Sequence, residues 1–456
     1  KAHENGLKVI MDLVVNHTSD QHPWFLESQK SKDNPYRDYY LWEDASPNQM
    51  PNDWISFFGD STWAYDEKTK QAYFHVFAKE QPDLNWKNPK VRQEIYDMIR
   101  WWLDLGIDGF RLDAISHIQK MPWNYKIKSW KGDGPWVPFM NVAGIETYMS
   151  DLKAIFDEYG ALTVGEASGV RSKQAPDWTD EAGYINMIFE LEHNVRKSNG
   201  NGQGSIYGYK KVIMRWQEDL LERGWNALYI ENHDQPRSID TFGDGSIESA
   251  KALAVSYMLL RGTPFIYQGQ EFGMTNFPFT DAKQLRADEI KKKYEMLMTE
   301  LSANQALAEV TQNSREHSRT PMQWDNSKNA GFTSGQAWME INPNFSVISS
   351  RTNQELIELY KKLIELRHQE PAISEGSIKF HFKRHPQVLV YERAEFLIIV
   401  NLADKKAHLD FTKIDSFTDS SAESSVINYQ QVLGSSNQKF QEKMVLSAWE
   451  YRVYKK

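Results

Sequence analysis

The sequence predicts an α/β protein in which parallel strands and helices form a β/α barrel. Short apolar runs rich in β-branched residues alternate with longer stretches whose apolar residues recur every three or four positions. Polar side chains gather where the apolar runs end. Strand followed by helix, repeated along a chain, is typical of a parallel sheet with crossover helices. The C-terminal ends of barrel strands form the active-site face, so we expect the polar ends to carry the function.

Strands are expected in the short apolar runs. These runs are 6–15, 106–115, 161–167, 184–191, 225–234 and 262–271. Helices are expected where apolar residues recur at helical spacing, and several of these stretches end in glycine, which favours a helix C-terminus. The helical stretches are 88–106, 145–160, 206–224, 247–262 and 353–369.

Two long segments interrupt this alternation. Residues 18–88 are rich in Trp, Pro, Asn and Asp and are too long for an ordinary loop, which predicts an inserted B subdomain. Residues 270–352 are expected to form a second, irregular insert. The barrel itself is predicted over 1–17 and 89–372. The last segment, 373–456, alternates apolar and polar residues and is predicted to form a separate C-terminal β-sandwich domain of antiparallel strands.

The composition excludes several classes of function. The 456 residues include 53 Lys and Arg against 62 Asp and Glu, so no basic surface for nucleic acid is expected. The absence of cysteine excludes disulfides and thiolate metal sites and fits a cytoplasmic protein. No apolar stretch approaches the roughly 20 residues of a membrane span. Aromatic residues make up 13% of the chain, which fits either a large aromatic core or surfaces that stack on sugar rings.

Two of the predicted strands end in carboxylates suited to catalysis. Arg111 and Asp113 lie two apart, so both side chains should lie on one face of the strand, with Leu112 on the other. A carboxylate beside an arginine has a lowered pKa and stays ionised, as a nucleophile must, although a structural ion pair would explain these two residues equally well. Glu166 ends the next run, after Gly165. Taken alone, it would be interpreted as a solvated glutamate.

Another predicted strand ends in Asn232, His233 and Asp234. Polar groups that follow a buried strand need partners, and capping of the following helix is the alternative role for Asp234. His17 follows the first run, where a histidine is more often a core residue than a ligand. No short histidine spacing supports a metal site, so ligation of a metal by His17 and His233 is not expected.

The polar residues at the strand ends indicate a single site when they are considered together. Three carboxylates, two histidines and an arginine are expected on one face of the barrel: Asp113, Glu166, Asp234, His17, His233 and Arg111. Converging carboxylates suit the cleavage of a glycosidic bond, in which one acts as nucleophile, one as general acid and one stabilises charge.

These segments resemble, in order, the motif set of glycoside hydrolase family 13, the α-amylase family. The segments "DLVVNH", "GFRLDA", "GEA" and "ENHD" resemble its four regions. "QPDLNW" resembles the signature of its oligo-1,6-glucosidase and α-glucosidase branch, which "SREHSRTPMQWD" and "GTPFIYQGQE" also match. The resemblance covers essentially the whole chain. It implies a (β/α)8 TIM barrel with an inserted B domain and a C-terminal β domain.

The resemblance also implies a role for each site residue. Asp113 would be the nucleophile that forms a covalent glycosyl-enzyme, and Glu166 the general acid and then the base. Asp234 would bind hydroxyl groups of the distorted sugar. The implied substrate-binding residues are His17, Arg111, His233 and Arg315, the last of which would help to close the pocket against a non-reducing end. Asp12 and Asn16 would mainly brace the first strand end.

The implied function is a retaining, exo-acting α-glucosidase that hydrolyses terminal α-1,4 or α-1,6 bonds of short oligosaccharides. A monomer without cofactor or metal is expected. Trehalose-6-phosphate hydrolase and sucrose isomerase are alternatives within the family, and a non-catalytic relative is the alternative of another class. Ala114 leaves more room than the valine that accompanies α-1,6 specificity in this branch, whereas "QPDLNW" favours α-1,6 bonds.

The chain departs from the family pattern at its start. The family barrel has two βα units before "DLVVNH", and each unit takes about 30 residues, so roughly 60 residues are expected to be missing. The missing part would include an aspartate that pairs with Arg315 and the loop in which some relatives hold calcium. Because strand number, tilt and stagger are linked in a barrel, we expect residues 1–456 alone to be inactive and prone to aggregation.

Overall fold

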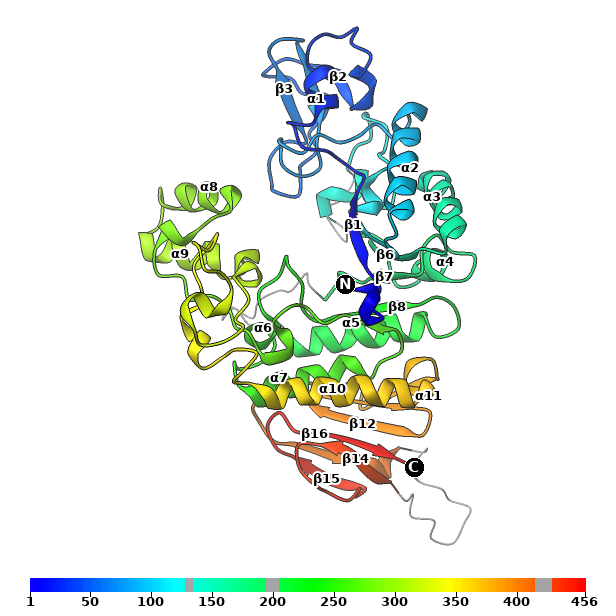
Figure 1. Cartoon of the computed structure of the whole chain (residues 1–456), viewed down its shortest axis with the longest axis vertical. Helices are drawn as coiled ribbons and strands as arrows, with labels where there is room; N and C mark the ends of the chain where they lie inside the picture. The colour runs from blue at the N-terminus through cyan, green and yellow to red at the C-terminus, as the bar shows by residue number, and fades with distance from the viewer. Residues whose placement is uncertain (128–133, 194–204, 415–428) are drawn as a thin grey trace. The chain divides into compact units, whose positions relative to one another are not determined.

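The computed structural model describes residues 1–127, 134–193, 205–414 and 429–456 (Figure 1). The chain divides into two compact units. The first contains Lys1–Leu191 and Glu222–Asn226, and the second contains Glu192–Leu221 and Ala227–Lys456. No helix in the described part of the chain combines the length and the apolar character needed to cross a membrane.

The first unit is built on parallel strands, as the sequence predicts. The strands are β1 (Ile10–Val14), β5 (Gly109–Asp113), β6 (Leu162–Glu166) and β7 (Met187–Phe189). They lie in the order β1-β5-β6-β7, each parallel to its neighbours. The register places Asp12 opposite Arg111 and Val14 opposite Asp113. The polar residues at the C-terminal ends of β1, β5 and β6 therefore lie on one edge of the sheet.

Helices connect these strands, and each has a local cause. The helix α2 (Pro89–Asp104) begins where the side chain of Asn88 accepts a hydrogen bond from the backbone of Lys90. Its buried residues recur every four positions: Val91, Ile95, Ile99 and Leu103. The helix α3 (Ile145–Tyr159) ends at Gly160 in the left-handed conformation, and a short helix α4 (Ala175–Thr179) precedes β7. Figure 1 shows α2 and α3 side by side, as their contacts also indicate.

The strand β1 is less buried than its apolar sequence predicts. Val14 is 42% exposed and Leu7, just before the strand, is 61% exposed. Within the described residues β1 has a strand neighbour, β5, on one side only. A strand with one open edge is shielded on fewer sides than a central strand, which fits the exposure of Val14 and Leu7.

The segment 18–88 folds as a small substructure of its own. It contains α1 (Pro23–Ser28) and an antiparallel sheet in the order β2-β4-β3, formed by β2 (Trp42–Asp44), β4 (Gln71–Phe74) and β3 (Trp63–Asp66). Its core is aromatic and includes Trp54, Trp63 and Phe74. The many aromatic side chains of this segment thus form the core of a substructure that has little regular helix.

The second unit continues the alternation of helix and strand. Its helices and parallel strands are α5 (Ile206–Asp219), β8 (Asn226–Leu228, which begins in the first unit), α6 (Ser238–Thr241), α7 (Ile247–Met258), β9 (Thr263–Pro264), α10 (Gln354–Gln369) and α11 (Pro371–Ser374). Strands β8 and β9 are parallel, with Ala227 opposite Thr263. Both are much shorter than the apolar runs that predict them.

The segment 270–352 is more regular than the sequence predicts. It contains α8 (Asp288–Leu297) and α9 (Ala303–Thr311), besides several short 3-10 turns. The helix α9 begins with a capping box formed by Ser302 and Gln305. The two helices pack through a small apolar cluster that includes Leu307 and Val310. The expectation of an irregular insert is wrong here. The many charged residues of α8 leave only a short apolar stripe, so its helical pattern is hard to recognise in the sequence.

The C-terminal segment forms antiparallel sheets, as predicted. The larger sheet has the order β10-β11-β12-β16-β14 and consists of β10 (Ile378–His381), β11 (Val388–Arg393), β12 (Phe396–Asn401), β16 (Tyr451–Lys455) and β14 (Gln430–Gly434). A second sheet pairs β13 (Ala407–Asp410) with β15 (Lys443–Leu446).

Both faces of the larger sheet are covered. On one face, Ile398 and Val400 belong to a core that also contains Leu253 of α7 and Leu363 of α10. On the other face, Ile399 joins a core with residues of β13 and β15. All six residues of β12 are consequently buried, so the alternation of buried and exposed residues expected here is absent. The predicted boundaries of barrel, insert and C-terminal domain remain predictions.

Candidate active site

Arg111 is the centre of the predicted site residues in the first unit. Its Nη1 donates to Asp113 Oδ1 at 2.5 Å and to Asp12 Oδ1 at 2.7 Å, and its Nη2 donates to Glu166 Oε2. The strand register explains the arrangement, because β5 lies between β1 and β6. One guanidinium therefore brings together the two carboxylates predicted to do the chemistry.

The three carboxylates around Arg111 stabilise its positive charge. Burial alone would lower its pKa, but the charges of Glu166, Asp113 and Asp12 outweigh burial and raise the pKa of Arg111 above its usual range. Arg111 thus stays protonated at every pH at which the protein is folded. Asp113 and Glu166 are about one-quarter exposed and open to a ligand.

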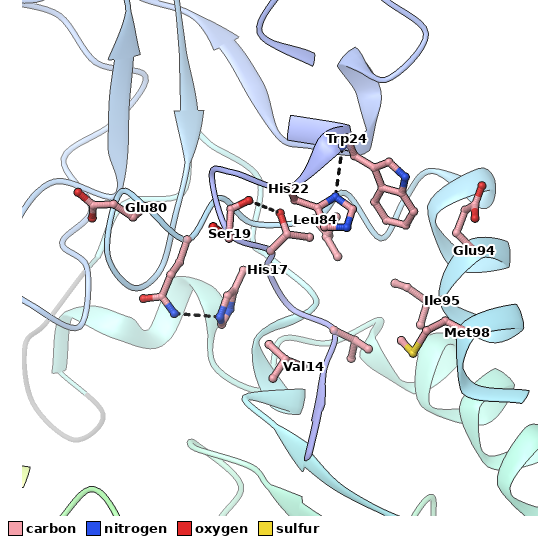
Figure 2. A pocket seen from close by; sticks show the side chains of 13 residues that line it. Val14, His17, Ser19, His22, Trp24, Glu80, Leu84, Glu94, Ile95 and Met98 are labelled. Carbon is pink, nitrogen blue, oxygen red and sulfur yellow. Dashed lines mark hydrogen bonds between the residues drawn. The ribbon is translucent and has the colours of Figure 1, made fainter. Parts of the chain in front are cut away.

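His17 is held by neighbours from the insert and by Asn16, two positions after the end of β1. Its Nε2 lies 3.0 Å from Gln81 Nε2, an interaction drawn as a dashed line in Figure 2. Its Nδ1 lies 3.4 Å from Asn16 Nδ2, and its ring packs edge-on against Phe77. Burial lowers the pKa of His17, and the charges of Asp83 and Asp113 offset part of that effect. His17 is therefore a positioned, mainly neutral imidazole.

A buried ion pair supports the end of β1. Lys120 Nζ lies 2.7 Å from Asp83 Oδ2 and donates to Asn16 Oδ1 at 3.1 Å. Burial lowers the pKa of Lys120, and the Asp83 charge counteracts it. Asn16 is fully buried and lies beside His17. The predicted bracing role of Asn16 is consistent with these contacts, whereas the sequence did not single out Lys120.

His17 lines a cavity of about 630 Å³ (Figure 2). Its wall includes Val14 of β1, Ile95 and Met98 of α2, and His17, His22 and Trp24. Of the predicted site residues in this unit, His17 lines it, whereas Asp113 and Glu166 do not. The cavity is thus separate from the carboxylates that Arg111 holds.

The backbone turns sharply directly after Asp113. Ala114 has φ 47° and ψ 29°, in the left-handed region, and is 4% exposed. A non-glycine residue in this conformation costs about 1–2 kcal/mol. The turn ends β5 at the predicted nucleophile and leads into a 3-10 turn at Ile115–His117.

In the second unit, Asp234 is the centre of the predicted site residues. Its Oδ2 lies 3.1 Å from His233 Nε2, and its Oδ1 accepts a hydrogen bond from Arg319 Nη2 at 2.5 Å. Burial would raise its pKa, but the hydrogen bond and charge of His233 and the charges of Arg319 and Arg315 lower the pKa of Asp234 well below its usual range. Asp234 is therefore a permanently ionised hydrogen-bond acceptor.

Arg315 has a different partner from the one the sequence predicts. It was expected to lack its anion, but its Nη2 pairs with Glu289 of α8, and its Nη1 lies 3.7 Å from Asp234 Oδ1. Arg319 contacts Asp234 more closely and also donates from Nε to the backbone oxygen of His233. Arg319 is the functional candidate that sequence reasoning missed, although it belongs to the quoted segment "SREHSRTPMQWD".

The loop that carries Asp234 is anchored by a buried ion pair. Arg237 Nη1 lies 2.6 Å from Glu231 Oε1, and both side chains are almost completely buried. Glu231 Oε2 also accepts hydrogen bonds from the backbone and hydroxyl of Ser238 at the start of α6. The N-cap position of α6 is Arg237, and Ser238 donates to Glu231, which argues against the capping role considered for Asp234.

No cluster of three or more His, Asp or Glu side chains in the described chain is arranged to hold a metal ion. The expectation that the protein uses no cofactor remains a prediction.

Comparison with known proteins identifies a family whose members are similar to this chain. A family model described as "Alpha amylase, catalytic domain" matches residues 1–376. An oligo-1,6-glucosidase of Parageobacillus thermoglucosidasius is 39% identical over 478 residues, which cover 99% of this chain and 84% of that protein. A probable oligo-1,6-glucosidase 3 of Bacillus subtilis is 43% identical over 405 residues, which cover 86% of this chain and 73% of that protein.

Solved structures give the same picture. The crystal structure of the isomaltulose synthase SmuA from Protaminobacter rubrum matches with a TM-score of 0.89 and 34% identity, covering 100% of this chain and 84% of that one. The crystal structure of Bacillus licheniformis trehalose-6-phosphate hydrolase matches with a TM-score of 0.88 and 31% identity, covering 99% of this chain and 84% of that one.

Proposed function

The chain belongs to the alpha-amylase family of glycoside hydrolases, and from this premise we propose that it is a retaining, exo-acting α-glucosidase. Its substrates would be short oligosaccharides with terminal α-1,4 or α-1,6 bonds, from which it releases glucose. The observation that carries the proposal is the Arg111 guanidinium, which binds Asp113 and Glu166 at the ends of neighbouring strands. A pair of adjacent carboxyl groups is what a retaining glycosidase requires.

The proposed reaction has two steps. Asp113, held in place by its hydrogen bond from Arg111, attacks the anomeric carbon while Glu166 donates a proton to the departing glycosidic oxygen. The bond from carbon to the leaving sugar breaks as the bond to Asp113 forms. Glu166 then takes a proton from water, the water attacks the same carbon, and the bond to Asp113 breaks. Two inversions give a product with the α configuration of the substrate.

We assign the binding of sugar hydroxyl groups to the ionised carboxylate of Asp234. His233 and Arg319 keep that carboxylate charged and fix its position. His17 is a further candidate for hydroxyl binding, because its nitrogens face amide groups and its ring is held by Phe77. The presence of all three carboxylates speaks against a non-catalytic relative.

Two alternatives share the same family. The solved neighbours include a trehalose-6-phosphate hydrolase and an isomaltulose synthase, at 31% and 34% identity. The curated relatives named oligo-1,6-glucosidase have 39% and 43% identity, which favours hydrolysis of oligosaccharides. A panel of maltose, isomaltose, sucrose and trehalose 6-phosphate separates the three activities, because sucrose isomerisation gives an isomer of sucrose instead of glucose.

The test uses the full-length protein. We expect proton NMR to show α-glucose as the first product from maltose or isomaltose, before mutarotation. Asp113→Asn, which is nearly isosteric, should lower kcat by several orders of magnitude and leave the circular dichroism spectrum unchanged. Release of β-glucose first, or an active Asp113→Asn variant, would refute the proposed mechanism. The monomeric state and the cytoplasmic location predicted from the sequence remain part of the proposal, and gel filtration and cell fractionation test them.

A further inference from the structure

The turn that carries Arg319 is tied to the loop of Asp234 at two neighbouring residues. Arg319 donates from Nη2 to Asp234 Oδ1 at 2.5 Å and from Nε to His233 O at 2.9 Å. One position earlier, the Oγ of Ser318 donates to the backbone oxygen of Gln235. Ser318 is completely buried, so water does not compete for that hydrogen bond. The end of the turn and the loop of Asp234 are therefore coupled.

Tyr267, from a third segment, holds the same turn. It follows β9 shortly after the strand ends, and its Oη donates to the backbone oxygen of Ser318 at 2.8 Å. Ser318 thus uses its backbone oxygen for Tyr267 and its hydroxyl for Gln235. A path of hydrogen bonds and one covalent step leads from Tyr267 through Ser318 to Arg319 and on to Asp234.

Tyr267 is itself held in place by its backbone and by its ring. Its backbone N–H donates to Gln270 Oε1 at 3.1 Å, and Gln270 Nε2 donates to the hydroxyls of the buried residues Tyr257 and Tyr360. Its ring faces the buried guanidinium of Arg237, whose Cζ lies 5.1 Å from the ring centre, in a cation–π contact. Burial raises the pKa of Tyr267, so its hydroxyl keeps the proton that it donates. The phenol is therefore a fixed donor.

The position of Arg319 matters because Asp234 depends on its neighbours for its charge. Burial would raise the pKa of Asp234, whereas His233, Arg319 and Arg315 lower it well below its usual range. The side chain of Arg319 is 32% exposed, so packing alone does not fix its guanidinium. A charge-assisted hydrogen bond weakens steeply when its distance and angle change. Whatever fixes the end of this turn therefore also fixes the charge and place of Asp234.

We infer that Tyr267 is a positioning residue for Asp234 and acts through Ser318 and Arg319. This inference rests on the proposed function, in which Asp234 binds hydroxyl groups of the reacting sugar. Without the phenol hydroxyl, Ser318 loses a donor and the end of the turn relaxes, so Arg319 holds Asp234 less closely. Because Asp234 is assigned to the distorted sugar, the effect should fall on kcat more than on KM.

The test begins with a substitution that removes one hydroxyl and keeps the ring. Tyr267→Phe in the full-length protein should lower kcat/KM for maltose or isomaltose by about fivefold, the effect of one lost hydrogen bond, and mainly through kcat. Ser318→Ala should act in the same direction, because it releases the turn from Gln235. Tyr454→Phe is the matched control: Tyr454 Oη also donates to a backbone oxygen, that of Gln438 at 3.1 Å, in the C-terminal sheet.

A double substitution separates positioning from a general loss of stability. In an Arg319→Lys background, Tyr267→Phe should lower kcat/KM by less than about twofold further, because the path through which it acts is already broken. The acid side of the pH profile should shift in the same direction in Tyr267→Phe as in Arg319→Lys, since the pKa of Asp234 rises in both. A purely structural role predicts effects that multiply and a pH profile of unchanged shape.

The outcomes separate this inference from the proposed function. If the unmodified protein releases glucose from neither disaccharide, the proposed function is wrong and the inference falls with it. If it does release glucose, and Tyr267→Phe is fully active or its effect multiplies with that of Arg319→Lys, the function stands and Tyr267 is not a positioning residue. A loss of kcat in Tyr267→Phe that Tyr454→Phe does not share, and that nearly disappears in the Arg319→Lys background, supports the inference. Circular dichroism checks each variant, and Ser318→Ala provides the same comparison if Tyr267→Phe unfolds.

Discussion

Two arginines, Arg319 and Arg315, lie at different distances from the Oδ1 atom of Asp234. Arg319 lies at 2.5 Å and also donates to the backbone of His233, whereas Arg315 lies at 3.7 Å and is paired with Glu289. Arg319 therefore positions Asp234 directly, and Arg315 contributes mainly a more distant charge.

We expect Arg319→Lys to lower kcat/KM for maltose or isomaltose by about tenfold, because lysine cannot make both contacts at once. Arg315→Lys should change it by less than about threefold. In Arg319→Lys the pKa of Asp234 should rise towards its usual range, so activity should fall more steeply on the acid side of the pH profile. Initial rates of glucose release from pH 4 to 7 test this, and equal effects of the two substitutions would contradict it.

Ala114 permits a test of linkage preference. Because its φ is 47°, a β-branched valine there should lower the free energy of unfolding by roughly 1–2 kcal/mol. If the side chain at this position also sets the preference, Ala114→Val should lower the ratio of kcat/KM for maltose over isomaltose. Ala114→Gly, which suits a positive φ, is the control. A ratio that stays constant in the valine variant would show that Ala114 does not select the linkage.

At the residue scale, the sequence predicts which residues lie at strand ends better than it predicts which distant side chains contact them. Asp113 and Glu166 lie at the C-terminal ends of their strands as expected, because the end of an apolar run is visible in one segment of sequence. Whether Arg315 or Arg319 contacts Asp234 depends on the path of a 3-10 turn more than 80 positions away. No local periodicity encodes such a pairing.

The 3-10 turn Arg315–Arg319 contains a histidine that couples its folding to pH. His317 Nδ1 accepts a hydrogen bond from the backbone N–H of Phe277 at 3.1 Å, and Nε2 donates to Thr311 O at 2.7 Å. Burial lowers the pKa of His317 to about 4. Protonation of Nδ1 would set two N–H groups against each other, so the folded turn requires the neutral ring.

The sign of the resulting pH effect follows from linkage. The unfolded chain takes up a proton near pH 6.5 and the folded chain near pH 4, so the free energy of unfolding should fall as the pH is lowered between these values. The loss attributable to His317 should approach roughly 3 kcal/mol at pH 4. Urea unfolding at pH 7, 5.5 and 4 measures it. His317→Gln should show a smaller decrease than the unmodified protein, and His408→Gln, at an exposed position, should show the same decrease.

At the scale of whole elements, prediction succeeded where helical period was strong. The bounds of α2, α3, α7 and α10 agree with the expected stretches within a few residues. The helices α8 and α9 are not among the expected stretches, because ten residues of α8 with many charges and nine residues of α9 give apolar stripes too short to stand out in the sequence. The burial of β12 on both faces could not be foreseen, since the coverage of its second face comes from β13 and β15, two short strands that pair with each other in a separate sheet.

At the scale of the molecule, the second unit has a core that crosses the predicted domain boundary. Residues of α7 and α10 share one apolar cluster with β11, β12 and β16. Removal of the C-terminal sheet would expose that cluster to water. The helices α7 and α10 therefore depend on the C-terminal sheet to bury their apolar faces.

We expect a protein from which residues 373–456 are deleted to aggregate, because the apolar faces of α7 and α10 would lose their cover. In the complete protein, Ile398→Ala, at a fully buried position of β12, should lower the free energy of unfolding by about 2–5 kcal/mol. Val445→Ala, on the 47% exposed Val445 of β15, should change it by less than about 0.5 kcal/mol. Thermal unfolding and gel filtration measure both, and a monomeric, folded protein without residues 373–456 would contradict the shared core.

The pairing of β1 with β5 has a consequence for how quickly the first unit can fold. Asp12 and Arg111 meet although 99 positions separate them, and the aromatic insert lies in between. Within the insert, β2 and β4 join residues only 27 positions apart, such as Asp44 and Gln71. Loop-closure entropy rises by about 0.6 kcal/mol with each doubling of loop length, so the local sheet has an advantage of roughly 1 kcal/mol in closure. The insert should therefore form first and shorten the effective distance across which β1 must find β5, which gives this segment a part in the folding rate as well as in the site.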